Sequence, residues 1–515
     1  MAEDQTFGRR WMILAVLLAG ILMGGMDFTI LNVALPAMSR DLLPSGAEQL
    51  WIVDAYALTV AATLVVCSAV GDRAGRRLVL LAGLSAFGLA SAAAALASAP
   101  GQVIAARAVQ GLGEAMTLSS TVAIIRVAFP SARERALAYG LWTAGASAGA
   151  ALGPVLGGLL VERFSWGAVF LVNVPIALLT VAAGAVLVPE SRVPDPRRWD
   201  VLGAVMSILG LAGTMYALQH IGQPGGLGWA TVVTGLLGVA LLAGFVVRQC
   251  RVRDPLLDMG LFADRRFSVS AAAIVACYGA YTGLLFLLTQ RLQLVNGYSP
   301  AEAGLTLAPI AVASAVGGVL APRLALVTGN RWAVTGGVSL LAFSLLALSV
   351  FGVAGNFAAF AAAGLGSGLI MTLGADSMMG AAPPERAGEA GAVQETGFAL
   401  GAGLGVAMLG IMITVAYQAA LAPVRSLSRA EFDTASGSLS AALELAGKIP
   451  GDAGAALRAG ARRAYESGFS VATSAAAVAL LVLAVLVAIL LRPVRTSAAG
   501  RPERSPASRS ADPVS

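Results

Sequence analysis

The sequence predicts an all-α membrane protein that crosses the bilayer fourteen times, and two observations support this prediction. The first is composition, because 57% of the 515 residues are apolar and only 12% are charged, against roughly 25% charged residues in soluble domains. A soluble fold could not hide so much apolar surface from water. The second is length, because fourteen helices of about 20 apolar residues each need about 280 residues and leave room for loops.

Helices are expected where apolar runs lie between charged residues, Pro and Gly. This pattern predicts spans at 11–35, 50–70, 78–99, 102–126, 136–160, 165–188, 201–219, 229–248, 268–290, 303–325, 332–352, 357–380, 387–417 and 467–491. Residues 418–466 form a predicted outer loop, of which 437–466 has the pattern of an amphipathic helix. Residues 492–515 are rich in Arg, Ser and Pro and are expected to be disordered.

Arginines in the short loops predict the orientation of the chain. An even number of spans places both termini on one side, and the short loops of that side carry most of these arginines. The short loops of the other side offer only Arg40, Arg163 and Arg291. Since basic residues collect on the cytoplasmic side, we expect both termini in the cytoplasm of a multi-pass cell-membrane protein. The net charge of +6 therefore indicates membrane orientation and not a nucleic-acid partner.

A repeated motif predicts two related halves. The segment 134–136 (Glu-Arg-Ala) with a following glycine opens the fifth span, and 385–387 opens the thirteenth in the same way. This indicates two pseudo-symmetric six-helix bundles plus two inserted central helices, with a substrate site at the interface of the bundles near mid-membrane. The predicted parts are an N-terminal bundle at 11–190, inserted helices at 200–250, a cytoplasmic loop at 251–267, a C-terminal bundle at 268–491 and a tail at 492–515.

Residue counts argue against an enzyme or a metal protein. The single histidine, His220, cannot build a histidine metal cluster or a catalytic triad. Cys67, Cys250 and Cys277 lie in or beside apolar runs and are expected to be buried hydrophobes. The single lysine, Lys448, is not followed by Ser or Thr, so the phosphate-binding loop of an ATPase is absent. We therefore expect no cofactor and a carrier driven by an ion gradient.

The loop between spans two and three is a candidate gating loop. It reads Gly-Asp-Arg-Ala-Gly-Arg-Arg at 71–77, where glycine permits a tight turn and the aspartate can pair with an arginine at a helix end. The alternative is a plain basic loop that only sets orientation. The candidate gating residues are Asp72, Arg73, Gly75, Arg76 and Arg77.

Span five carries glycines at intervals of four, which share one helix face. Such a face lets a neighbouring helix approach closely, and a proline within it bends the span. Ordinary packing of membrane helices would use the same pattern. The residues are Gly145, Gly149, Gly153, Pro154, Gly157 and Gly158.

Together these motifs resemble the major facilitator superfamily. The loop 72–77 is similar to its signature loop, 107–113 to its second motif and 145–158 to the antiporter motif of its exporters. Residues 26–36 resemble the signature of the fourteen-helix drug:proton antiporters, and 44–54 resembles the quaternary-ammonium and antiseptic exporters among them. The resemblance implies that the glycine face of span five meets the C-terminal half and seals the outer side in the inward-open state.

Charged residues inside the predicted spans are candidates for function, because a charge in the membrane is costly. Asp27 lies about 12 Å below the outer end of span one, and Glu395 about 12 Å into span thirteen from the inner end. Asp54 lies only about 6 Å deep. Arg107 and Glu114 share a face of span four. These five residues are the predicted substrate- and proton-binding set.

Each of these candidates has a plainer interpretation. Asp54 lies near enough to the interface to be simply hydrated, and Arg107 could be a structural partner for a carboxylate. Glu114 could neutralise Arg107 one or two turns away. Trp51, Tyr56 and Trp142 could supply cation–π contacts to an aromatic cation, although aromatic residues are common at membrane interfaces.

The sequence therefore predicts proton-coupled efflux of lipophilic, mainly cationic drugs or antiseptics by alternating access. Drug and proton would compete for the same carboxylates. The alternatives are a narrow-spectrum exporter of one antibiotic and, against the pattern of span five, a proton-coupled uptake permease for a nutrient. The expected partners are small-molecule drugs, protons and lipid, and the chain is expected to act as a monomer.

Overall fold

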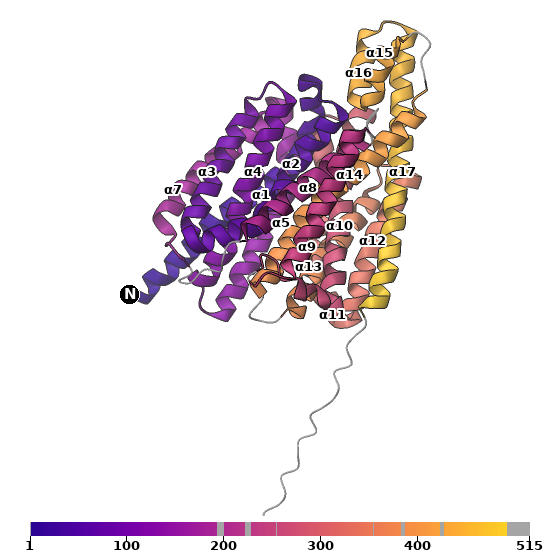
Figure 1. The fold of residues 1–515 in the computed structure, drawn as a ribbon. Coiled ribbons are helices and arrows are strands. Elements are labelled where there is room, and N and C mark those ends of the chain that lie inside the picture. The colour runs from indigo at the N-terminus through magenta and orange to yellow at the C-terminus, as the bar shows by residue number, and fades with distance from the viewer. Residues whose placement is uncertain are drawn as a thin grey trace, which may run out of the picture.

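The computed structural model describes residues 2–192, 200–221, 228–253, 255–353, 355–382, 387–422 and 427–491. Within these ranges the chain is helical, without a strand, and the long helices run side by side (Figure 1). The helices of the N-terminal half are α1 Ala2–Leu42, α2 Gly46–Ala74, α3 Arg76–Ala95, α4 Pro100–Ala128, α5 Ala132–Arg163, α6 Ala168–Leu171 and α7 Asn173–Leu187. The all-α membrane fold is therefore confirmed.

Two helices lie between the halves, α8 Val201–Ile221 and α9 Trp229–Gln249. A short 3₁₀ helix, η1 Met259–Ala263, leads into the C-terminal half. Its helices are α10 Arg265–Gln290, α11 Pro300–Thr328, α12 Asn330–Phe351, α13 Phe357–Ala381, α14 Ala387–Ala420, α15 Arg429–Gly437, α16 Leu439–Lys448 and α17 Asp452–Leu490. A π-helical turn, η2 Arg291–Val295, continues α10.

Thirteen candidate spans in the described residues are long and apolar enough to cross a membrane. The predicted span 102–126 is not among them, although it forms α4, a helix of 29 residues that packs against α2 and α3. Arg107 and Glu114 are among the polar residues that lower the hydropathy of α4. The count of fourteen crossings therefore stays a prediction.

Helix packing repeats between the two halves. In the N-terminal half α1 packs against α5, and α4 packs against both α2 and α3. In the C-terminal half α10 packs against α14, and α13 packs against both α11 and α12. The halves meet through α5 with α11 and through α14 with α2, which are equivalent pairs under this repeat. Glu385 and Arg386 of the second sequence motif lie outside the described residues.

Contacts between the halves include two hydrogen bonds at their predicted outer ends. The Gln293 side chain donates to the Val33 carbonyl at 2.9 Å, which joins η2 to α1. Ser299, the N-cap of α11, donates to Glu162 of α5 at 3.2 Å. In this conformation the outer ends of the halves are in contact.

The inserted helices pack against each other, and α8 also packs against α2 and α14. At its start, Asp200 accepts hydrogen bonds from the Gly203 amide at 2.8 Å, Arg248 at 2.7 Å and Gln249 at 2.8 Å. Burial alone would raise the pKa of Asp200, but these three hydrogen bonds outweigh it and the pKa lies below its ordinary value. The carboxylate therefore ties α8 to α9 at neutral pH.

The predicted outer loop is mostly helical. Residues Arg429–Gly437 and Leu439–Lys448 form α15 and α16, and α17 begins at Asp452, fifteen residues before the predicted start of the last span (467 − 452). These elements rise beyond the bundle, at the end opposite to the N-terminus (Figure 1). The Tyr417 hydroxyl donates to the Ala435 carbonyl at 2.9 Å and holds α15 to α14. The tail 492–515 lies outside the described residues.

Candidate functional site

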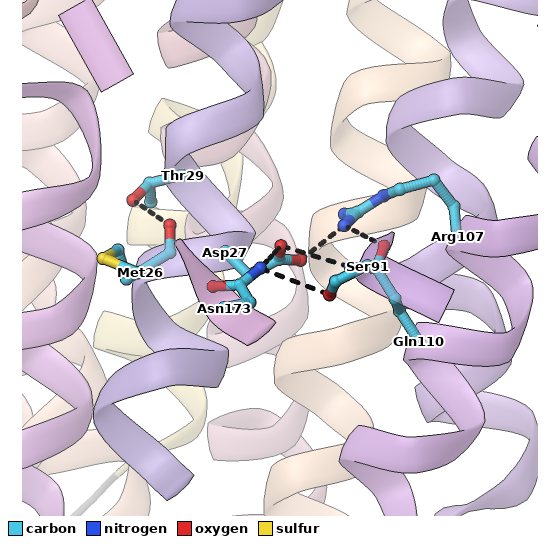
Figure 2. A network of polar contacts seen from close by, with 7 residues as sticks. All are labelled: Met26, Asp27, Thr29, Ser91, Arg107, Gln110 and Asn173. Carbon is cyan, nitrogen blue, oxygen red and sulfur yellow. Dashed lines mark hydrogen bonds and ion pairs between the residues drawn. The ribbon is translucent and has the colours of Figure 1, made fainter. Parts of the chain in front are cut away.

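Asp27 of α1 lies inside the N-terminal bundle and is fully buried. Its Oδ2 atom accepts a hydrogen bond from Nη1 of Arg107, also buried, and the two side chains form an ion pair. Its Oδ1 atom accepts from Nδ2 of Asn173 at 2.7 Å and from Nε2 of Gln110 at 3.5 Å. Figure 2 shows these side chains converging on Asp27.

Hydrogen bonds among these partners hold the network together. Nη1 of Arg107 also donates to Oε1 of Gln110 at 3.1 Å, and Nε2 of Gln110 donates to the Ser91 hydroxyl at 2.7 Å. A buried ion pair keeps its charges only if further hydrogen bonds satisfy both groups. Because the partners come from α3, α4 and α7, Asp27 faces the interior of its own half and not the interface between the halves.

A break in the sixth predicted span places Asn173. The run 165–188 is divided into α6 and α7 at Val172, and Asn173 is the first residue after the break. Its side chain is fully buried. The sequence analysis did not single out Asn173 or Ser91; the available signal was an amide and a hydroxyl in otherwise apolar runs.

A row of aromatic rings crosses from one half to the other beside this network. The guanidinium of Arg107 lies 4.4 Å from the ring centroid of Tyr56. Phe28 lies 6.1 Å from Tyr56 and 5.9 Å from Tyr278 of α10, with which it stacks. Tyr278 in turn lies 5.2 Å from Phe398 of α14. The Tyr56 ring, expected to bind a drug cation, is therefore in contact with a cation of the protein.

Glu114 and Glu395 bring one carboxylate from each half toward the interface. Glu114 is 5% exposed and lies close enough to Asp27 and Glu395 to sense the charge of each. Within the described chain its Oε2 atom has no hydrogen-bond partner, and the ion pair of Arg107 is made with Asp27 instead. Glu395 accepts a hydrogen bond from Gln394 at 3.3 Å and lies near Tyr278.

Gly24 of α1 makes room for Glu114. A Cβ atom at this position would collide with the carboxylate of Glu114. Gly24 was not among the sequence-predicted site residues, since nothing in the sequence shows that α4 approaches α1 at this point. The glycine therefore fixes where the Glu114 carboxylate lies.

Asp54 lies apart from this cluster. Its side chain is 1% exposed and accepts a hydrogen bond from Gln219 of the inserted helix α8 at 2.8 Å. The hydrated position near the membrane surface, considered from the sequence, is therefore wrong. Sequence reasoning did not find Gln219.

The candidate gating loop is held by the end of α7. Asp72 pairs with Arg76 at 2.9 Å, so this aspartate does bind an arginine at a helix end. The Arg77 side chain donates to the Ala185 carbonyl, and the Arg77 amide donates to Glu190 at 3.2 Å. Gly75 has φ +116°, and a Cβ there would contact the Glu190 carboxylate. Position 75 therefore requires glycine, because its φ is positive and because the Glu190 carboxylate leaves little room for a Cβ atom.

The glycines of span five divide between two neighbours. Cβ atoms at four of them would meet α1, and these are Gly145, Gly149, Gly153 and Gly157. A Cβ at Gly158 would meet Pro300 and Ala301, and one at Gly304 would meet Pro154. The expected contact of span five with the C-terminal half is therefore found at Pro154 and Gly158. It is wrong for the other four, which let α5 pack closely on α1 of the same half.

The remaining aromatic candidates have structural contacts. Trp142 donates to the Thr121 hydroxyl at 3.2 Å within the N-terminal half, and Trp51 is packed against its apolar core. In the part of the chain that the structure describes, no group of three or more His, Cys, Asp or Glu side chains could hold a metal ion.

Two packed helical halves with carboxylates buried in the membrane define a membrane transport protein. The chain matches the family described as Major Facilitator Superfamily over residues 16–406, and it belongs to that family.

Two relatives agree with this assignment, and a solved structure shares the fold. The chain is 37% identical to the multidrug efflux pump LfrA of Mycolicibacterium smegmatis, over 95% of this chain and 98% of that protein. It is 35% identical to the methyl viologen resistance protein SmvA of Salmonella typhimurium, over 93% and 97%. The structure also resembles a bacterial homologue of the human lysosomal transporter Spinster, in an inward-facing and unoccupied conformation, with a TM-score of 0.67 at 18% identity, over 94% and 97%.

Proposed function

We propose that this protein exports lipophilic, mainly cationic drugs or antiseptics in exchange for protons. The observation that carries the proposal is the position of the buried Glu114 and the partly buried Glu395, carboxylates of different halves that lie close enough to interact. An amphipathic cation at this position would contact both halves and an aromatic row. The similarity to the efflux pumps LfrA and SmvA supports export. We place the protein in the plasma membrane with both termini in the cytoplasm.

In this proposal Asp27 receives the proton. In the unprotonated state its charge balances Arg107, and Glu114 is free to bind the drug cation. A proton on Asp27 would leave the Arg107 charge unbalanced seven residues from Glu114, about 10.5 Å along the helix. At an effective dielectric constant of about 20, that charge repels the drug by about 1.6 kcal/mol, or roughly fifteenfold in affinity. Protonation from the outside would thus favour drug release.

The driving force depends on how many protons are exchanged. Moving one charge across 100 mV is worth about 2.3 kcal/mol, and one pH unit is worth about 1.36 kcal/mol. Exchange of one monovalent cation for one proton moves no net charge, so only the pH difference drives it. Exchange for two protons would add the membrane potential. Transport of ethidium at fixed pH difference and varied voltage distinguishes these cases.

Purified protein in lipid vesicles tests the proposal. Ethidium and a pH indicator are followed together, and each ethidium movement is expected to be matched by proton movement in the opposite direction. Asp27→Asn should abolish the proton movement, whereas Asp433→Asn, an exposed acid of the outer loop, should leave both unchanged. Ethidium accumulation that persists after both the pH difference and the membrane potential are abolished would contradict proton coupling.

A further inference from the structure

Asp54 and Gln219 form a buried polar pair between α2 and the inserted helix α8. Asp54 is 1% exposed and Gln219 is fully buried. Nε2 of Gln219 donates to Oδ2 of Asp54 at 2.8 Å. The inserted pair α8–α9 otherwise joins the bundle through apolar packing against α2 and α14, so this hydrogen bond is a specific contact of the insertion with a predicted site residue.

Each of the two side chains has a second polar atom that lacks a partner. Oδ1 of Asp54 and Oε1 of Gln219 are both buried, and neither has a hydrogen-bond partner within the described ranges. Both atoms are acceptors when Asp54 is ionised. A buried acceptor without a donor costs about 1–3 kcal/mol, and more when it is charged. The ionised pair therefore leaves two acceptors unsatisfied in the membrane.

One added proton satisfies both atoms. A carboxylic acid and a carboxamide are planar groups of similar shape, and they can form two parallel hydrogen bonds. With the first bond from Nε2 to Oδ2 in place, an O–H formed at Oδ1 can donate to Oε1. The proton comes from water, the charge of Asp54 is neutralised, and no other bond is made or broken.

No charged neighbour of Asp54 neutralises its carboxylate in place of a proton. Asp27 pairs with Arg107, but none of the described ion pairs involves Asp54. The charged or titratable groups in the inner turns of α1, α4 and α14 and in the last turn of α8, all packed against α2, include Asp27, Arg107, Glu114, Glu395 and His220. Arg107 is bound to Asp27, and His220 makes its contacts with Tyr216 on α8. The other three are acids, so none of them can neutralise an ionised Asp54.

We propose that Gln219 is a positioning residue that holds Asp54 as an uncharged carboxylic acid through two hydrogen bonds. The inserted helices then take part in proton binding, and loss of the proton weakens the contact of α8 with α2. This inference rests on the proposed proton coupling for its physiological meaning. The pairing itself is a property of the protein without drug, so it can be tested separately.

Infrared difference spectroscopy of the purified protein observes the acid directly. The carbonyl stretch of a protonated carboxylic acid assigned to Asp54 is identified by its loss in Asp54→Asn. Gln219→Leu is expected to move this band to higher wavenumber, because hydrogen bonding lowers the stretch frequency. Gln249→Leu is the matched control, since Gln249 also binds a buried aspartate in the inserted pair but does not contact Asp54. A band that is unmoved by Gln219→Leu overturns the proposal.

Thermal stability gives a second measurement. Asparagine at position 54 reproduces the donor and acceptor of the protonated acid, so Asp54→Asn is expected to raise the Tm at a pH where Asp54 is ionised. The gain should be smaller in the Gln219→Leu background, where the buried charge is still removed but the paired hydrogen bonds cannot form. A gain of equal size in both backgrounds overturns the pairing. If the band shift and the Tm pattern are found but ethidium moves without protons, the proposed function fails and the pairing stands.

Discussion

Arg107 of α4 binds Asp27 of α1 inside the N-terminal bundle, and neither side chain is more than 2% exposed. The pair is closed off by Asn173, Gln110 and Ser91, so a drug molecule at the interface does not contact Asp27 in this conformation. In the proposed exchange, coupling between proton and drug therefore acts through charge or helix movement. Glu114, which senses the charge of Asp27, is the nearest residue suited to transmit it.

Removal of either member of the Arg107–Asp27 pair should destabilise the protein. Arg107→Ala leaves an unpaired buried carboxylate and Asp27→Asn leaves an unpaired buried guanidinium, and loss of one partner of a buried pair typically costs about 3–5 kcal/mol. We expect a large loss of Tm in Arg107→Ala and partial recovery in the Asp27→Asn, Arg107→Ala double variant. Differential scanning fluorimetry in detergent measures both. Additive losses in the double variant would show that the pair does not interact.

Gly24→Ala should displace the Glu114 carboxylate. The new methyl group would occupy the place of the carboxylate, so the affinity for ethidium should fall, by an amount comparable to that of Glu114→Ala. In the Glu114→Ala background the obstructing atoms are gone, and Gly24→Ala should then have little further effect. Equilibrium binding of ethidium to the wild type, the two single variants and the double variant measures this double-mutant cycle.

Gly20→Ala is the matched control for this cycle. Gly20 lies one turn earlier on α1, and a Cβ there would meet the end of the flexible Leu84 side chain at 3.3 Å. Ethidium affinity should be close to that of the wild type. If Gly20→Ala and Gly24→Ala weaken binding equally, the position of Glu114 is not the cause.

Gly153→Ala should disrupt the contact of α5 with α1. A Cβ at Gly153 would meet the Thr29 hydroxyl and the backbone of Met26 at 2.8 Å, and backbone atoms cannot move aside locally. Overpacking of this kind costs about 1–3 kcal/mol. Gly140→Ala on the same helix has open space and should raise stability by about 0.5–1 kcal/mol. Equal Tm values for the two variants would contradict the close packing.

The sequence predicted the helices well because each is recorded locally as an apolar run with polar ends. Ser45, Ser299 and Ser428 form capping boxes that begin α2, α11 and α15, and such signals are also local. The division of span six at Val172 was not predicted. The early part of α17, from Asp452, falls within 437–466, where the sequence predicted an amphipathic helix.

The candidate site was only partly predictable, because the sequence shows which charges lie in the membrane but not which way they face. Asp27 and Arg107 were both identified, yet their pairing depends on how α1 packs on α4. Gln219 and Gly24 were missed, because an amide near a helix end and a glycine in an apolar run have many ordinary uses. Their roles are visible only in the structure, where Gln219 contacts Asp54 and Gly24 contacts Glu114.

Asp200 should make stability depend on pH. Its pKa in the folded protein lies below the ordinary value, so its contribution is fully present above the unfolded pKa of about 3.9 and is lost as the pH falls through the folded pKa. At pH 7, Asp200→Asn should lower stability by about 1–3 kcal/mol, the usual worth of hydrogen bonds to a charged group. Between pH 7 and 3 the Tm difference from the wild type should shrink. A Tm difference that grows toward low pH would contradict the lowered pKa of Asp200.

The two interface acids should matter most for doubly charged drugs. At an effective dielectric constant of about 20, a charge pair at about 5 Å is worth roughly 3 kcal/mol before desolvation, so a drug with a second positive charge gains from a second carboxylate. Glu395→Gln is expected to lower transport of methyl viologen, a dication, at least about tenfold more than transport of ethidium, a monocation. Glu444→Gln, which removes an acid that pairs with Lys448 on the outer helix α16, is the matched control and should change neither. Initial rates in vesicles at equal protein density measure the ratio of the two drugs. An equal loss for both drugs in Glu395→Gln would assign Glu395 to the coupling step and remove it from drug recognition.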